Sequence, residues 1–214
     1  MNDEKSAAKT QEVMGGSGAV LEAEIERADS AARAGMRVIL VEGTSDQLAV
    51  ETLALRRGRA LEREGIAVIP TAGVTNLNRF LDLLGPGGHD VQLAGFCDQP
   101  EETRLRLGLE RAGIATALDR DTMEKVGFYV CVRDLEDELV RALGADRMLG
   151  IMEMQGHLRR FRSFQNQPAQ SHKRIEDQIW RWLGNHKIRY ASLMVEALDL
   201  DQVPRPLDGV LSSV

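Results

Sequence analysis

The sequence predicts an α/β fold, with a mostly parallel four-stranded sheet flanked by helices and a helical C-terminal extension. Four short apolar runs rich in Val, Ile and Leu recur between residues 36 and 132, and a segment with helical character follows each run. Strands that alternate with helices in this way pair in parallel, because each helix carries the chain back across one face of the sheet.

The first strand is the apolar run MRVILV at residues 36–41. Such a continuous run is typical of a strand that is covered on both faces. Ser45 can cap a following helix that continues to about Arg57, and we expect a shorter helical piece to Glu64.

The same pattern recurs three times. The other predicted strands span residues 66–70, 91–97 and 127–132, and the helices that follow them span 75–84, 101–111 and 135–144. Further helices are expected over residues 146–158, 174–183 and 189–198.

The chain of 214 residues divides into three predicted parts. Residues 1–17 are polar and end in Gly-Gly-Ser-Gly, so we expect a disordered lead. Residues 18–144 form the core, which begins with a helix over residues 19–34. Residues 145–214 form the helical extension, which we expect to end in an extended tail that contains proline.

The composition is that of an ordinary soluble globular protein, with 43% apolar and 28% charged residues. No apolar run approaches the roughly 20 residues that a membrane helix needs, and no hydrophobic stretch follows a basic start. We therefore expect a cytoplasmic protein without membrane contact. Cys97 and Cys131 lie in apolar runs, where we expect them to be buried, and their spacing does not match a zinc site.

Charge is distributed unevenly along the chain. The net charge of −6 argues mildly against tight, non-specific binding to duplex DNA. Residues 159–189, however, hold eight basic and two acidic residues, a net charge of +6. An acidic core joined to a basic extension suits an enzyme that acts on a polyanion. The candidate nucleic-acid-binding residues are Arg159, Arg160, Arg162, Lys173, Arg174 and Arg189. Phe161 and Phe164 stand among them and would either stack on bases or anchor the segment to the core.

Carboxylates follow three of the four predicted strands. Glu42 ends the first strand, with Asp46 one helical turn further, and Asp98 ends the third. Asp134 ends the fourth strand, and Glu136 lies in the next turn. The carboxyl ends of parallel strands share one edge of the sheet, where clustered carboxylates would repel one another. A divalent cation would relieve that repulsion, and oxygen ligands suit Mg²⁺ or Mn²⁺.

Helix capping is the competing interpretation for three of these acids. Asp46, Asp134 and Glu136 lie at or inside predicted helix N-termini, where the helix dipole stabilises an acid by ~0.3–1 kcal/mol. Glu42 and Asp98 have no capping role. They are therefore the more specific candidates.

A family resemblance extends this prediction. The stretch VILVEGTSD at residues 38–46 resembles the opening motif of TOPRIM domains, which have a Rossmann-like fold. DLEDEL at residues 134–139 and KIRYA at residues 187–191 resemble the OLD (overcoming lysogenization defect) branch of nucleases. The chain thus resembles a stand-alone TOPRIM domain over about residues 36–144 and, more loosely, to about residue 200.

The resemblance implies a role for each strand-end acid. Glu42, Asp46 and Asp98 match the positions that hold a catalytic metal ion in the family. Asp134 and Glu136 would bind a second metal ion or complete the first site. Two ions ~3.5–4 Å apart would contact the attacking and leaving oxygens of a phosphodiester.

Lys187 matches the family's basic residue that stabilises charge on the scissile phosphate. Together with Glu42 and Asp98, it would be catalytic. Without the resemblance, the sequence predicts that Lys187 is an exposed lysine before a helix.

The sequence departs from the family in two respects. The usual third-strand motif Asp-x-Asp reads Asp98-Gln99-Pro100 here, and only Glu101 and Glu102 are close enough in sequence to replace the second acid. OLD nucleases also carry an ATPase domain ahead of the TOPRIM domain, whereas this sequence contains no GxxxxGK[ST] motif. We therefore expect no ATP as a cofactor, although a separate ATPase partner is compatible with the sequence.

The leading hypothesis is metal-dependent phosphodiester hydrolysis on nucleic acid, by a nuclease or a related nucleotidyl hydrolase or transferase, with DNA favoured over RNA. Rejoining of strands would need a catalytic tyrosine, and the only candidates are Tyr129 and Tyr190. The alternative is a weakly active or inactive TOPRIM module that binds nucleic acid or a partner ATPase. A third hypothesis is an enzyme of free nucleotides or another small phosphorylated substrate. The oligomeric state stays open, and a homodimer is compatible with the sequence.

Overall fold

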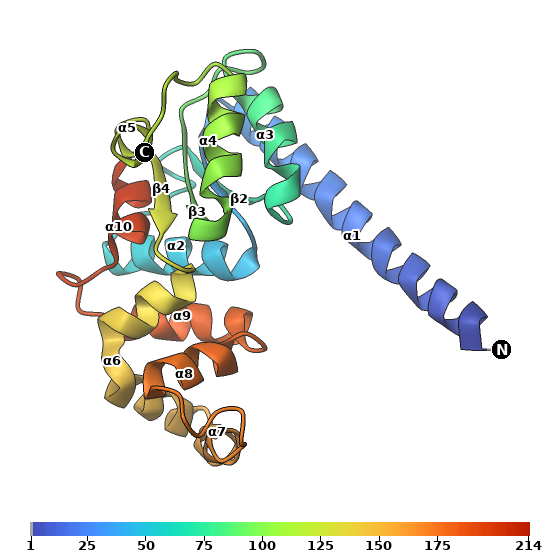
Figure 1. Ribbon diagram of the computed structural model, residues 1–214. Helices are drawn as coiled ribbons and strands as arrows, with labels where there is room; N and C mark the ends of the chain where they lie inside the picture. The colour runs from blue at the N-terminus through green and yellow to red at the C-terminus, as the bar shows by residue number, and fades with distance from the viewer. Residues whose placement is uncertain (1) are drawn as a thin grey trace.

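The protein contains a four-stranded parallel sheet with helices on both faces (Figure 1). The computed structural model describes the backbone of residues 2–214 and the side chains of residues 18–73 and 75–214. The strands are β1 (Arg37–Val41), β2 (Ile66–Pro70), β3 (Leu93–Asp98) and β4 (Phe128–Cys131). They pair in the order β2-β1-β3-β4, and every pair is parallel. The predicted fold class and all four strands are confirmed.

The centre of the sheet is packed closely between β1 and β3. Leu40 of β1 lies in register with Ile69 of β2 on one side and Gly95 of β3 on the other. A Cβ atom at Gly95 would stand 2.7 Å from the carbonyl oxygen of Leu40 and 3.1 Å from the ring of Phe128. Only glycine fits at this position, which brings the two central strands and their carboxyl ends together.

Alternate residues of β1 enter two separate apolar cores. Val38 and Leu40 pack on one face, under α1 (Asn2–Arg33), α3 (Leu77–Leu84), α4 (Glu102–Arg111) and α5 (Arg120–Lys125). Ile39 and Val41 pack on the other face, against α2 (Thr44–Arg56), α6 (Leu135–Met154) and α10 (Arg205–Ser212). Period-2 alternation with both faces buried explains the continuous apolar run in the sequence.

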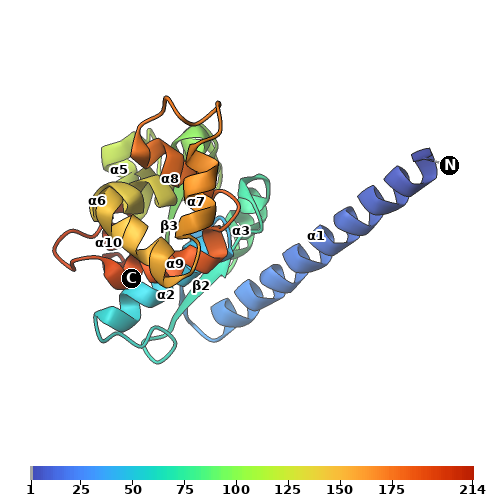
Figure 2. The same ribbon diagram turned by 90° about the horizontal axis from the view of Figure 1, so that it is seen from below.

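The C-terminal extension up to α9 packs below the sheet, on the side to which the strands point, whereas α10 packs against the sheet (Figures 1 and 2). It contains the second half of α6 with α7 (Leu158–Gln165), α8 (Ile175–Leu183) and α9 (Lys187–Ala197). Helix α6 turns sharply at Gly144, where φ is 74°. Helix α9 lies along α2, and the hydroxyl groups of Thr52 and Ser192 are 3.0 Å apart across that contact. The extension therefore contacts the helix that follows β1.

Several predicted segments differ from the structure. The last residues do not form an extended tail, because Pro206 occupies the first turn of α10, where proline is well tolerated. Leu207, Val210 and Leu211 of this helix are buried at helical spacing. Residues 57–64 form turns and no helix, and the short helices α5 and α7 were not expected.

The predicted disordered lead, residues 1–17, lies outside the residues whose side chains the structure describes, and it stays a prediction. Cys97 and Cys131 are buried and unpaired, as expected. None of the helices in the described part of the chain is both long and apolar enough to cross a membrane.

Candidate metal and phosphodiester site

The direction in which strands are added to the sheet reverses between β1 and β3. The chain passes from β1 outward to β2 and then returns to the other side of β1 to form β3 and β4. In open parallel sheets such a reversal leaves a crevice beyond the carboxyl ends of the two central strands, where ligands bind. Glu42 directly follows β1, and Asp98 is the last residue of β3. The two most specific acids of the sequence therefore stand at this crevice.

Five carboxylates gather there, and we call them the acidic rim: Glu42, Asp46, Asp98, Asp134 and Glu136. Their mutual repulsion is visible in the pKa of Asp98, which burial and the charges of Glu42 and Asp134 raise to about 7. Burial and the charge of Glu101 likewise raise the pKa of Glu42. The strand-end acids are thus close enough to disfavour each other's ionisation.

Asp46 combines the two interpretations that the sequence left open. Its Oδ2 accepts the backbone N–H of Gly43 at 3.0 Å, so the side chain caps α2. Burial first, and the charge of Glu136 second, raise the pKa of Asp46 to about 8. A cap on an exposed helix would have a lowered pKa. Asp46 is therefore a capping residue that also lies within reach of the other acids.

Asp134 is the N-cap of α6 and is buried, with 8% of its surface exposed. Its Oδ1 accepts the backbone N–H of Asp137 at 2.8 Å. The indole Nε1–H of Trp180 donates to Oδ1 at 2.9 Å and to Oδ2 at 2.8 Å. The role of Trp180 could not be predicted from the sequence, since this contact joins residues 46 positions apart and depends on how α8 packs.

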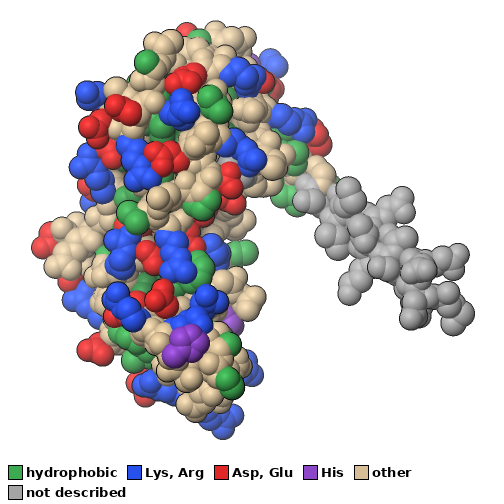
Figure 3. Space-filling model, viewed as in Figure 1, with side chains coloured by type: hydrophobic (Ala, Val, Ile, Leu, Met, Phe, Trp, Pro, Cys, Tyr) green, Lys and Arg blue, Asp and Glu red, His purple; other side chains and the backbone are tan. Residues whose placement is uncertain are grey.

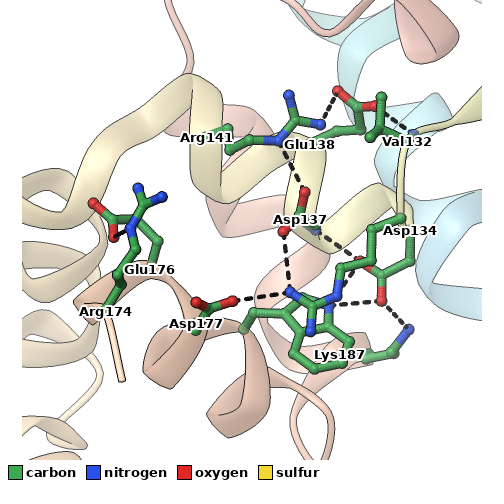
Figure 4. A network of polar contacts seen from close by, with 11 residues as sticks. Val132, Asp134, Asp137, Glu138, Arg141, Arg174, Glu176, Asp177 and Lys187 are labelled. Carbon is green, nitrogen blue, oxygen red and sulfur yellow. Dashed lines mark hydrogen bonds and ion pairs between the residues drawn. The ribbon is translucent and has the colours of Figure 1, made fainter. Parts of the chain in front are cut away.

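Lys187 is the first residue of α9, and its Nζ lies 2.7 Å from Oε2 of Glu136. The same atom lies 3.7 Å from Oδ2 of Asp134 (Figure 4). Burial opposes the charge on Lys187, but attraction to Glu136 outweighs it and raises the pKa of the lysine. The lysine therefore stays charged. It is not the free surface lysine of the alternative interpretation, because the extension brings it to the acidic rim.

The missing second aspartate of the third-strand motif has a structural explanation. Pro100 lies in the short 3₁₀ helix Gln99–Glu101, at a position that proline favours at the start of a helix. Of the two acids that could replace the aspartate, Glu102 is paired with Arg120 at 2.7 Å. Glu101 also has an arginine partner, Arg104, yet its charge is the strongest one acting on Glu42. Glu101 is thus the nearer substitute.

The donor set fits a hard divalent cation in its chemistry. All five members are carboxylates, which Mg²⁺ and Mn²⁺ prefer, and a cation would offset the repulsion that raises the pKa values of Asp46 and Asp98. Among the described residues, however, no three side chains stand in a ready-made ligand cluster. Binding would have to draw Glu42, Asp46 and Asp98 inward, and their metal role stays a prediction.

The six predicted nucleic-acid-binding residues lie on the extension, and most are exposed: Arg159, Arg160 and Arg162 on α7, Lys173 and Arg174 before α8, and Arg189 on α9. Lys and Arg side chains are spread over this half of the molecule with acids between them (Figure 3). Phe161 is fully buried against Trp182 and anchors α7 to the core. The proposal that Phe161 stacks on bases is therefore wrong.

Neither tyrosine reaches the acidic rim. Tyr190 is fully buried, and its hydroxyl lies 2.9 Å from Nδ1 of His157. The hydroxyl of Tyr129 lies 3.1 Å from Oγ of Ser213, beyond the end of α10. A strand-rejoining reaction through a tyrosine is thus not supported by this arrangement.

The parallel sheet, with acids after β1, β3 and β4, has the arrangement that the resemblance to TOPRIM domains implies. The family described as "Overcoming lysogenization defect protein-like, TOPRIM domain" matches residues 36–97. The protein thus contains a TOPRIM domain that resembles that of the OLD family. No functionally curated protein matches the sequence.

Solved structures show the same fold. One structure of the C-terminal region of the Xanthomonas campestris pv. campestris OLD protein is 27% identical, with a TM-score of 0.63, and the match covers 83% of this chain and 93% of that one. The C-terminal region of the Burkholderia pseudomallei OLD protein is 18% identical, with a TM-score of 0.65 and coverage of 83% and 95%. The similarity therefore extends beyond the sheet into the helical extension.

TOPRIM domains are typically metal-dependent enzymes that act on nucleic acids or nucleotides, and they generally bind Mg²⁺. The domain class thus associates this chain with a metal-dependent activity related to nucleic acid.

Proposed function

We propose that the protein hydrolyses phosphodiester bonds in nucleic acid, with DNA favoured over RNA, and that it needs Mg²⁺ or Mn²⁺ to do so. The observation that carries the proposal is the meeting of strand-end carboxylates with Lys187. Glu42 and Asp98 come from the two central strands, whereas Lys187 reaches the same place from α9, paired with Glu136 at 2.7 Å. The packing of the extension on the core does not by itself require a charged side chain at the carboxyl-terminal edge of the sheet.

The acids and the lysine would have different tasks. Glu42, Asp46 and Asp98 would hold the metal, and Glu101 would supplement them in place of the missing aspartate. When bound, a divalent cation supplies an activated water and neutralises charge on the phosphate. Lys187 would donate a hydrogen bond to a non-bridging phosphate oxygen, where negative charge develops.

Glu136 would act first on Lys187, whereas Asp134 would complete the metal site. Glu136 is buried, at 4% exposure, and holds the ammonium group at the rim in the absence of substrate. An incoming phosphate would compete for the same group. A second metal ion at Asp134 and Glu136 would compete with the ammonium group of Lys187 for the charge of these carboxylates.

A groove beside the acidic rim would receive the nucleic acid backbone. This α2–α9 groove has a volume of about 660 Å³ and is lined by Thr44 and Ser45 of α2 and by residues 184–189. It contains Lys187 and Arg189 and includes Thr44, the first residue of α2, and the N-terminus of a helix favours an anion. The predicted basic residues on α7 and before α8 would contact more distant phosphates.

The second candidate is a module that binds nucleic acid or a partner ATPase without cleaving. Two observations favour it: Pro100 occupies the position of an expected metal ligand, and the described carboxylates do not stand in a ligand cluster. The two candidates differ in one measurable property, which is cleavage.

A plasmid-nicking assay with Mg²⁺ and then Mn²⁺ tests the proposal, in parallel with single-stranded DNA and RNA. Metal-dependent cleavage by the wild type should disappear in Glu42→Ala and Asp98→Ala. It should persist in Asp201→Ala, which removes an exposed acid between α9 and α10. Absence of cleavage by the wild type on all substrates would reject hydrolysis and favour the binding module.

A further inference from the structure

Trp180 is hydrogen-bonded to the acidic rim, although it is uncharged and belongs to none of the sequence motifs. Its Nε1–H donates to both carboxylate oxygens of Asp134, at 2.9 and 2.8 Å. Together with the backbone N–H of Asp137, at 2.8 Å, it gives Asp134 two neutral donors from two different helices. Because Asp134 is buried, these donors fix the plane of its carboxylate.

Arg133 covers the face of the Trp180 ring. Its guanidinium carbon lies 3.3 Å from the ring centroid. The same guanidinium pairs with Asp177 of α8 at 3.1 Å and with Asp137 of α6 at 3.5 Å (Figure 4). The indole is therefore held both by its N–H and by its face, so its rotation would break several contacts at once.

Lys187 contacts the two carboxylates in front of it unequally. It lies 2.7 Å from Glu136 but 3.7 Å from Asp134. The indole gives Asp134 a neutral donor, so both of its carboxylate oxygens have a partner other than the ammonium group. A carboxylate bound by neutral donors retains lone pairs for a cation, whereas a tight ion pair with Lys187 would neutralise it.

We propose that Trp180 is a positioning residue of the metal site, whose indole N–H holds Asp134 in the orientation for a divalent cation and keeps it apart from Lys187. The inference deepens the proposed function and rests on it, because it concerns the same site. It also explains why a helix of the extension contacts the rim: α8 supplies the group that orients a strand-end acid.

The test compares two conservative variants of the same helix. Trp180→Phe keeps an aromatic ring beneath Arg133 but removes the N–H. Trp182→Phe is the matched control, because among the described residues its buried Nε1 has no hydrogen-bond partner, and its ring packs on Phe161 and His186 and makes no hydrogen bond to Asp134. We expect Trp180→Phe to weaken Mn²⁺ binding, measured by calorimetry without substrate, by about tenfold to a hundredfold, as is usual when a partner of a metal ligand is lost. Trp182→Phe should bind Mn²⁺ with the affinity of the wild type.

Fluorescence gives a second readout, which reports on the surroundings of the indole itself. The chain contains two tryptophans, so Trp180 is the only one left in Trp182→Phe. Mn²⁺ should change the emission of Trp180 in this variant, with the same midpoint as the calorimetric titration. Circular dichroism of the metal-free variants should match that of the wild type.

The outcomes are distinct. Wild-type affinity in Trp180→Phe would overturn the inference and leave the proposed function standing. Equal weakening in both variants would overturn it as well, because the effect would then come from general disturbance of α8. A wild type that binds no Mn²⁺ would overturn both the inference and the metal-dependent function.

Discussion

At the scale of single residues, the acidic rim contains groups whose charge opposes folding. Asp46 accepts only one backbone N–H, from Gly43, and its pKa is raised from 3.8 to about 8 by burial and by the charge of Glu136. The pKa of a carboxylate that only caps an exposed helix is normally lowered. A buried acid that costs stability in the metal-free protein is typical of a site arranged for a ligand.

Because the charge of Asp46 destabilises the metal-free protein, we expect Asp46→Asn to change the stability in a pH-dependent way. Between about pH 4 and pH 8 the folded state keeps a proton that the unfolded state releases, so this residue lowers the free energy of unfolding progressively as pH rises. Asparagine retains an oxygen for the N–H of Gly43 but carries no charge. We expect the metal-free variant to melt above the wild type, with a larger difference at pH 8 than at pH 5. About 1 kcal/mol corresponds to roughly 2–4 °C for a protein of this size.

Thermal unfolding at the two pH values measures this effect, and Mn²⁺ provides the control. The ion should raise the melting temperature of the wild type more than that of Asp46→Asn, because the variant lacks a charged ligand. A melting temperature of the variant that is lower at pH 8 than that of the wild type would contradict the prediction.

The strand-end acids could be located from the sequence, because each follows an apolar run whose end is visible. Glu42 and Asp98 needed only the parallel order of the strands to be placed together. Trp180 and Arg133 could not be found in this way. The hydrogen bond of Trp180 to Asp134 and the packing of Arg133 on the Trp180 ring both depend on how α8 docks. Tertiary packing of the extension carries no short-range signal in a single sequence.

At the scale of elements, strands were predicted more accurately than the ends of the chain. Fully buried strands are marked by unbroken apolar runs, whereas α10 was hidden by Pro204 and Pro206, which suggested an extended tail. The signal that would have revealed α10 is the spacing of Leu207, Val210 and Leu211, all of which are buried against the sheet.

Two helical glycines allow a matched prediction on the packing of α10. A Cβ atom at Gly209 would stand 2.3 Å from the ring of Tyr129, whereas a Cβ atom at Gly150 of α6 would meet nothing within 4 Å. Gly209→Ala should therefore destabilise the protein by about 1–3 kcal/mol through overpacking. Gly150→Ala should stabilise it by up to about 1 kcal/mol, because alanine favours the helix. Urea unfolding measures both, and equal effects of the same sign would contradict this account of α10.

At the scale of the whole molecule, the candidate site is shared between the core and the extension. The sheet supplies Glu42 and Asp98, whereas α8 and α9 supply Trp180 and Lys187. The attachment of the extension to α2 therefore decides whether the site is complete. This division explains why the motif at residues 38–46, taken by itself, does not describe the whole site.

Arg56 of α2 is one residue that fastens the extension to the core. Its guanidinium donates to the carbonyl oxygens of Val195 and Leu198, at 2.8 and 2.7 Å, at the C-terminal end of α9. The carbonyl oxygen of Val195 otherwise accepts the backbone N–H of Leu198 at 3.3 Å, and a cation at the C-terminal end of a helix is favourable. Arg56→Ala should cost about 1–3 kcal/mol of stability, because two carbonyls lose a charged donor.

The same substitution should also disturb the site from a distance. A looser α9 no longer holds Lys187 at the rim, so we expect faster amide hydrogen exchange in α9 than in α3, together with weaker Mn²⁺ binding and slower cleavage. Arg63→Ala, which removes an exposed arginine ahead of β2, is the control and should change none of these properties. If Arg56→Ala accelerates exchange in α9 while cleavage stays at the wild-type rate, the extension does not complete the site, and the catalytic role of Lys187 must be abandoned.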